Sequence, residues 1–184
     1  MRADARRNYE HLVEQAKIAF AEFGVDASLD EIARRAGVAS GTLYRHFPTR
    51  LDLVEVVLAG QIAELVDLGR GLLAAEDEFE ALAGWLRATL RHGMAYGGLA
   101  AAVLNSALDR ADDLMSNWHA ELFEVAAALL ARARASGVVA ADARAEDVVK
   151  MVSAIGWAVE GSADGSVQGD RLLGLLLNGL RTRS

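Results

Sequence analysis

The sequence predicts an all-α protein of about nine helices, in which a small N-terminal helical head precedes a larger helical domain. Its 184 residues include only one proline, and β-branched residues rarely cluster, so little interrupts helices and little favours strands. Apolar residues recur three and four positions apart through most of the chain, which is the spacing of helices with one buried face. The length suits one or two domains with cores of their own.

The first predicted helix extends from about Asp4 to Phe23, and Gly24 follows it. Its apolar residues recur at helical spacing and form one stripe. We expect this stripe to pack on the two short helices that come next, because short helices depend on tertiary packing for their stability.

Residues 28–54 predict two short helices joined by a tight turn, followed by the start of a third helix. Ser28 can accept a bond from the backbone three residues on, and Glu31 can reach back, as in a capping box. Gly37 stands where a helix end needs a left-handed residue, and Pro48 ends the second helix. This arrangement is typical of a helix-turn-helix, whose second helix fits the major groove of DNA. An ordinary corner between two helices would show the same spacing.

The exposed face of the second short helix carries small and hydrogen-bonding side chains, unlike the Glu and Lys mixture of a solvated face. These residues are Ser40, Gly41, Thr42, Tyr44, Arg45 and His46. Arg50 follows in the first turn of the next helix, where a positive charge is unfavourable unless an anion binds nearby. A DNA phosphate would supply that anion, so Arg50 is a candidate phosphate contact.

The stretch IARRAGVASGTLYRHFPTRLDL resembles the DNA-binding signature of the TetR family of bacterial transcriptional regulators. The matching residues are Ser28, Ile32, Ala33, Ala36, Gly37, Val38, Gly41, Thr42, Leu43, Tyr44, His46 and Phe47. The sequence departs from the family pattern at Ala39, with Ser40 following, and has Arg50 where the family usually has Lys. The resemblance is specific and covers about the first third of the chain, whereas later residues share the general helical layout and a looser likeness.

This resemblance implies a repressor whose two subunits place their recognition helices in successive major grooves of double-stranded DNA, at a palindromic operator. Thr42 and Arg45 are then the stronger candidates for base contacts, and Tyr44 and His46 for phosphate contacts. Ser28 would hold the DNA backbone at the start of the first short helix.

The rest of the chain predicts further helices at about 50–68, 77–96, 99–108, 112–135, 145–161 and 167–181. We assign residues 1–50 to the helix-turn-helix domain and residues 51–184 to a ligand-binding and dimerisation domain. The helix that begins at residue 50 connects the two. Gly69 and Gly71 interrupt the apolar pattern beyond its predicted end, and Gly97 and Gly98 separate the helices on either side of them.

The net charge of −7 is unevenly distributed. Residues 1–50 contain eight Lys and Arg against seven Asp and Glu, whereas residues 51–184 contain eleven against nineteen. The small excess of positive charge in the first segment predicts modest non-specific affinity for DNA, so its basic groups must act locally.

The sequence contains no cysteine, which excludes disulfides, thiol nucleophiles and CxxC metal sites. Its four histidines are scattered, and it has no GxSxG, P-loop or strand-linked GxGxxG motif. We therefore expect no enzymatic activity, no metal and no cofactor. The first residues lack the apolar segment of a secretory signal, and no apolar run reaches membrane-spanning length, which predicts a soluble cytoplasmic protein without membrane partners.

Large aromatic, methionine and polar side chains in the second domain predict an apolar pocket for a small hydrophobic effector. The candidates are Trp85, His92, Met94, Tyr96, Asn105, Met115, Trp118, Phe123 and Trp157. Each of these side chains could equally belong to an ordinary core. His92 and Tyr96, four residues apart, could form a partly buried polar pair.

The last two predicted helices are apolar over more than one face, whereas a surface helix of a monomer normally has a single apolar stripe. Two such helices from each subunit could pack as a four-helix bundle across a two-fold axis, and the resemblance implies the same mode of dimerisation. The candidates for this interface are Val148, Val152, Ile155, Val159, Leu172, Leu176 and Leu180.

The sequence therefore predicts a ligand-responsive repressor that binds a palindromic operator as a homodimer. Two other interpretations stay open: a small-molecule binding module whose helix-turn-helix is only structural, and a transcriptional activator of the same family. The first would bind a ligand but no specific DNA sequence. The second depends on the position of the operator, which this chain does not encode.

Overall fold

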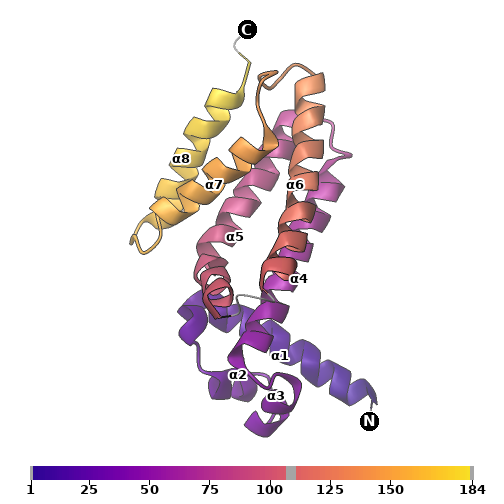
Figure 1. The fold of residues 1–184 in the computed structure, drawn as a ribbon, viewed down its shortest axis with the longest axis vertical. Helices are drawn as coiled ribbons and strands as arrows, with labels where there is room; N and C mark the ends of the chain where they lie inside the picture. Colours follow the sequence, from indigo (N-terminus) through magenta and orange to yellow (C-terminus); the bar gives the residue numbers. More distant parts are fainter. Residues whose placement is uncertain (1, 107–110, 183–184) are drawn as a thin grey trace. The chain divides into compact units, whose positions relative to one another are not determined.

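The computed structural model describes the backbone of residues 2–106 and 111–182, and the side chains of residues 4–96 and 120–182. The described residues form eight α-helices and one 3-10 turn (Figure 1). In chain order they are α1 (Arg2–Phe23), η1 (Gly24–Asp26), α2 (Leu29–Arg35), α3 (Ser40–His46), α4 (Arg50–Leu72), α5 (Glu78–Ser106), α6 (Ala111–Ala135), α7 (Ala145–Ala158) and α8 (Gly165–Leu180).

The all-α prediction is confirmed, with one difference in the middle of the chain. The helices expected at 77–96 and 99–108 are a single helix, α5, which continues through Gly97 and Gly98. A glycine within a helix lowers its stability without ending it. A glycine that ends a helix usually adopts the left-handed conformation, with a positive φ angle. Among the described glycines, positive φ angles occur at Gly24, Gly37, Gly137 and Gly161. None of the described helices combines the length and hydropathy that crossing a membrane requires.

The chain divides into two compact units. The first comprises Met1–Gln61 with Gly98–Asp112, and the second comprises Ile62–Gly97 with Asp113–Ser184. Helices α4 and α5 each contribute residues to both units.

In the first unit, α1 packs on the helix-turn-helix that α2 and α3 form. Each of the three helices contributes buried apolar side chains, and the fully buried ones include Leu12, Phe20, Ile32 and Leu43. This packing agrees with the expectation that α1 supports the two short helices, and it fixes which face of α3 remains outside.

In the second unit, α4 approaches α5 and α6 closely at Gly69. A Cβ atom at this position would overlap the side chain of Val125 and would lie 2.8 Å from Nε1 of Trp85. The indole of Trp85 is fully buried, and its Nε1 donates to the backbone oxygen of Leu65 at 3.0 Å. Gly69 is therefore required by close packing rather than by a helix end, and α4 continues to Leu72.

Candidate nucleic-acid interface

The ends of α2 are fixed by local hydrogen bonds. Ser28 is the N-cap, and its side chain accepts from the backbone N–H of Glu31 at 3.3 Å. At the other end Gly37 has φ +72°, and the N–H of Val38 donates to the oxygen of Ala33 at 3.0 Å. This is the Schellman pattern, and it produces the tight turn that leads into α3.

Helix α3 has one buried and one exposed face. Leu43 and Phe47, four residues apart, are buried, which anchors the helix to the core of the first unit. On the other side Tyr44 is 46% exposed and Arg45 is exposed. The structure thus presents these two candidates at the surface of a helix whose orientation is fixed by its apolar face.

The other candidates on α3 differ in accessibility. Gly41 is exposed, whereas Ser40, Thr42 and His46 are half-buried. The ring of His46 packs edge-on against Tyr9 of α1, with 5.8 Å between their centroids. Tyr9 also lies 5.3 Å from the ring of Phe47. The imidazole is therefore held by an aromatic contact from α1, which the local motif around His46 could not reveal.

Arg50 joins the start of α4 to the chain before α2. Its Nη1 donates to the backbone oxygen of Val25 at 2.7 Å and also to that of Ala27, and the side chain is half-buried. These two carbonyl groups partner the positive charge that was expected to need a phosphate. The helix itself begins with a reciprocal cap, in which the N–H of Thr49 donates to Asp52 at 2.7 Å and the N–H of Asp52 donates to Thr49 Oγ1 at 3.2 Å.

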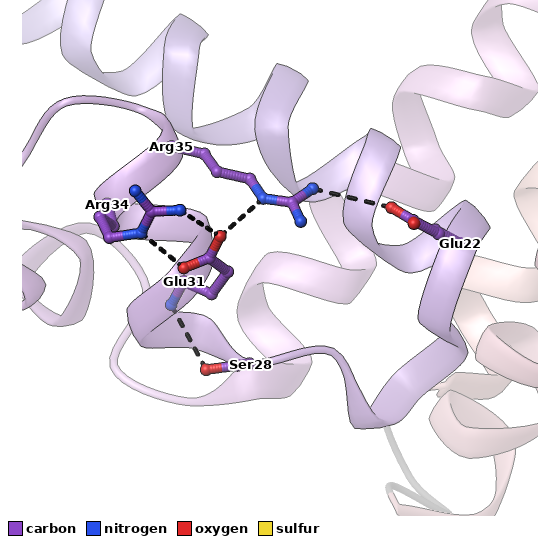
Figure 2. A network of polar contacts seen from close by, with 5 residues as sticks. All are labelled: Glu22, Ser28, Glu31, Arg34 and Arg35. Atoms are coloured by element: carbon purple, nitrogen blue, oxygen red, sulfur yellow. Dashed lines mark hydrogen bonds and ion pairs between the residues drawn. The ribbon is translucent and has the colours of Figure 1, made fainter.

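The predicted capping box at Ser28 is half formed, because the Glu31 carboxylate turns toward two arginines (Figure 2). Nε and Nη2 of Arg34 each donate to Glu31 at 2.7 Å, and Nε of Arg35 donates at 2.9 Å. Nη1 of Arg35 also lies 3.7 Å from a carboxylate oxygen of Glu22. Hydrogen bonds from Arg34, and then from Arg35, lower the pKa of Glu31 to about 2, since both favour its charged form.

The candidate effector-binding residues lie in different environments. Trp85 belongs to the core, and Trp157 is 79% exposed. Met94 and Phe123 are half-buried, and Asn105, Met115 and Trp118 lie outside the residues whose side chains are described.

The structure does bring His92 and Tyr96 together, with 5.4 Å between their ring centroids. Tyr96 is buried, and His92 is half-buried. Burial lowers the pKa of His92, and the nearby charge of Glu64 opposes this shift.

The candidate dimer residues on α7 and α8 separate into two groups. Val148, Val152 and Val159 are buried within the subunit, so their side chains do not lie on the exposed surface of these helices, and Ile155 is also largely buried at the edge of the groove. The others line an open apolar groove of about 530 Å³, together with three residues that the sequence analysis missed. The lining residues are Met151, Ile155, Leu172, Leu175, Leu176, Gly179 and Leu180.

The exposed apolar residues of α7 and α8 could have been found from helical spacing. Met151 is 50% exposed and Leu175 is 65% exposed. Met151 precedes Ile155 by four residues, and Leu175 follows Leu172 by three, so each shares a face with a predicted residue. The sequence pattern identified two apolar faces on each helix but could not tell which one the subunit covers with its own core.

Two family models match the sequence. The model of bacterial regulatory proteins of the tetR family matches residues 12–57, and the model of the C-terminal domain of SbtR-like transcriptional regulators matches residues 77–182.

Among solved structures, the chain is similar to a TetR transcriptional regulator from Streptomyces coelicolor, with 35% sequence identity over 95% of this chain and 99% of that one, and a TM-score of 0.80. It is also similar to a TetR transcription regulatory protein from Mycobacterium vanbaalenii, with 35% identity over 98% and 99% of the two chains and a TM-score of 0.75. The transcriptional regulator TtgW of Pseudomonas putida is 40% identical over 60 residues, which are 32% of this chain and 45% of the relative. The chain thus matches less than half the length of this curated relative.

Proposed function

The chain belongs to the TetR family of bacterial transcriptional regulators, and from this we propose that it is a ligand-responsive repressor that binds a palindromic operator as a homodimer. A small hydrophobic effector releases it from the operator. Because its proposed partner is chromosomal DNA, we expect it to act in the cytoplasm.

The observation that carries the proposal is the exposed face of α3. Leu43 and Phe47 hold this helix against the core, while Tyr44 and Arg45 stay accessible. A helix fixed in this way can enter a major groove without rearrangement. We assign base contacts to Thr42 and Arg45.

Further DNA contacts complete the proposed surface. Phosphate contacts are assigned to Ser28, Tyr44, His46 and Arg50, and Ser40 and Gly41 allow close approach at the start of α3. The half-buried Thr42 needs a close fit between helix and groove, which major-groove docking provides.

We further propose that a second copy of the chain covers the apolar groove on α7 and α8. Large exposed apolar patches on soluble proteins mark interaction sites, and this groove is lined by the exposed side chains of Met151 and Leu175. Two helices from each subunit would form a four-helix bundle across a two-fold axis. The resulting dimer would place its recognition helices about 34–36 Å apart, one turn of DNA.

The proposed release mechanism is a shift between two populations. An effector bound in the larger unit would favour a spacing of the two heads that misses successive grooves, and it can do so only through different affinities for the two states. Apolar compounds that raise the melting temperature of the protein should therefore lower its operator affinity. Compounds that stabilise the protein without changing operator affinity would contradict this mechanism.

Selection from random duplex DNA, followed by sequencing of the retained fragments, tests the DNA-binding function directly. We expect an enriched inverted repeat whose half-site centres are separated by one helical turn. If the folded protein enriches no sequence, the helix-turn-helix is structural and the chain is a small-molecule binding module. The position of the selected operator relative to its promoter then distinguishes a repressor from an activator.

A further inference from the structure

The arginines of the helix-turn-helix differ in how the chain itself engages them. On α2, Arg34 and Arg35 both bind the carboxylate of Glu31, through contacts of 2.7 to 2.9 Å (Figure 2). On α3, Arg45 is exposed, and within the part of the chain that the structure describes no carboxylate pairs with it. Glu31 thus offsets part of the positive charge on the first helix of the motif, whereas the charge of Arg45 on the second helix is left available.

Stability gives little reason for this arrangement. The side chain of Arg34 is 74% exposed and that of Glu31 is 36% exposed, and exposed pairs of this kind contribute little to folding. Their effect on a charged partner is larger, because non-specific DNA binding depends mainly on how many phosphates the protein can neutralise. In helix-turn-helix proteins the first helix crosses the DNA backbone, which puts charges on α2 within reach of phosphates.

We propose that Glu31 is a specificity-determining residue, which binds Arg34 and Arg35 and so withholds their charge from DNA phosphates. Non-specific binding is suppressed, while Arg45 on the recognition helix keeps its full charge for the operator. This inference rests on the proposed DNA-binding function. The proposal accounts for the small excess of positive charge in residues 1–50. Acidic side chains offset charges that would bind any phosphate, while Arg45 remains available for base edges.

The expected effect follows from counterion release. One additional phosphate contact changes the slope of log K against log salt by about −0.9, which corresponds to about eightfold in affinity at 0.1 M salt. Replacing Glu31 by glutamine removes the negative charge and keeps the size of the side chain. The backbone N–H of Glu31 that bonds Ser28 is unaffected, so the helix cap stays.

The test measures binding of the full-length protein to a non-specific duplex by fluorescence anisotropy, at several salt concentrations. We expect Glu31→Gln to raise non-specific affinity about 3- to 10-fold at 0.1 M salt, to steepen the salt slope, and to reduce the preference for the selected operator. Circular dichroism and thermal unfolding of each variant confirm that it is folded. An unchanged non-specific affinity in the folded Glu31→Gln variant would overturn the proposal.

One control variant separates the contacts of Glu31 from an effect of net charge, and a double variant tests whether the released Arg34 causes the gain in affinity. Glu22→Gln removes the same charge from α1, where Glu22 approaches Arg35 only at 3.7 Å, and should change non-specific affinity less than about twofold. In the double variant Glu31→Gln/Arg34→Gln the affinity should return close to the wild-type value. Equal effects of Glu22→Gln and Glu31→Gln would show that only total charge matters, and would also overturn the proposal.

This experiment is distinguishable from a failure of the proposed function. If the wild-type protein binds no duplex even at low salt, DNA binding itself is refuted. If the wild type binds its operator and Glu31→Gln behaves like the wild type, the regulator function stands and the role of Glu31 does not.

Discussion

The guanidinium of Arg50 donates to the backbone oxygen of Val25 at 2.7 Å, which ties the first turn of α4 to the turn that precedes α2. The two residues are 25 positions apart, and the same Nη1 also bonds Ala27. Arg50 therefore positions Ser28, the N-cap of α2, relative to the helix that leads out of the head. Any phosphate contact that Arg50 makes has to coexist with this tether.

Replacing Arg50 by alanine should lower the free energy of unfolding by about 1.5–3 kcal/mol, because two carbonyls lose a charged donor. If Arg50 also contacts a phosphate, the slope of log K against log salt should flatten by about 0.9 for operator and non-specific DNA alike. Urea unfolding and salt titrations measure the two effects separately.

Arg50→Lys is the matched control, since lysine keeps the charge on a shorter, unforked side chain. It should restore the salt slope more fully than the stability. An alanine variant with the wild-type salt slope would leave the tether to Val25 and Ala27 as the only role of this residue.

Arg45 should determine sequence preference at one position of the operator. Arg45→Gln is expected to cost about 1–3 kcal/mol of discrimination if the guanidinium binds a guanine. Competition binding with single-base variants of the selected operator measures this directly. Arg50→Ala, which removes a proposed phosphate contact, should instead weaken binding to all sequences alike. If Arg45→Gln does the same, Arg45 contacts phosphate and another residue reads the base.

The helices of this protein follow from helical periodicity in the sequence, and so does the buried face of α3. Long-range relationships do not, because local spacing does not encode them. The contact of Arg50 with Val25 and the packing of Tyr9 on His46 depend on how α1 and α4 meet the motif. Glu31 was expected to complete a helix cap, and two arginines compete for its carboxylate instead.

Helices that are apolar on more than one face are a second limit of sequence-based prediction. On α7 and just after it, the sequence shows only that several side chains are apolar, not which of them are buried. The buried ones are Val148, Val152 and Val159, whereas Met151 and Trp157 are exposed. Packing within the subunit decides this difference. Glycines are a third limit, since the sequence does not state their φ angles. Gly69 serves close packing and Gly98 lies inside α5, whereas Gly37 and Gly137 adopt the left-handed conformation that ends a helix.

The apolar groove on α7 and α8 predicts a specific loss of self-association. Leu175→Asp places a charge where the second subunit should pack, and we expect the dimer dissociation constant to rise by at least about 30-fold, as for a hot-spot residue. Sedimentation equilibrium measures it. Leu68→Asp is the control, because Leu68 is also an exposed leucine of the second unit, on α4. Operator affinity should fall with Leu175→Asp and not with Leu68→Asp. A Leu175→Asp protein that remains dimeric would place the interface elsewhere.

His92 predicts how stability depends on pH. Burial lowers the pKa of His92 below its ordinary value of 6.5, so in the range between the lowered pKa and 6.5 the unfolded chain binds a proton that the folded chain does not. The free energy of unfolding should therefore rise with pH through this range and become level above it. Urea unfolding from pH 5 to 8 measures the slope of the free energy of unfolding against pH.

His92→Asn should reduce this slope. His11→Asn, which removes an exposed histidine, is the control. If the wild type and His92→Asn show the same slope, the imidazole is protonated equally in both states and its burial beside Tyr96 has no energetic consequence.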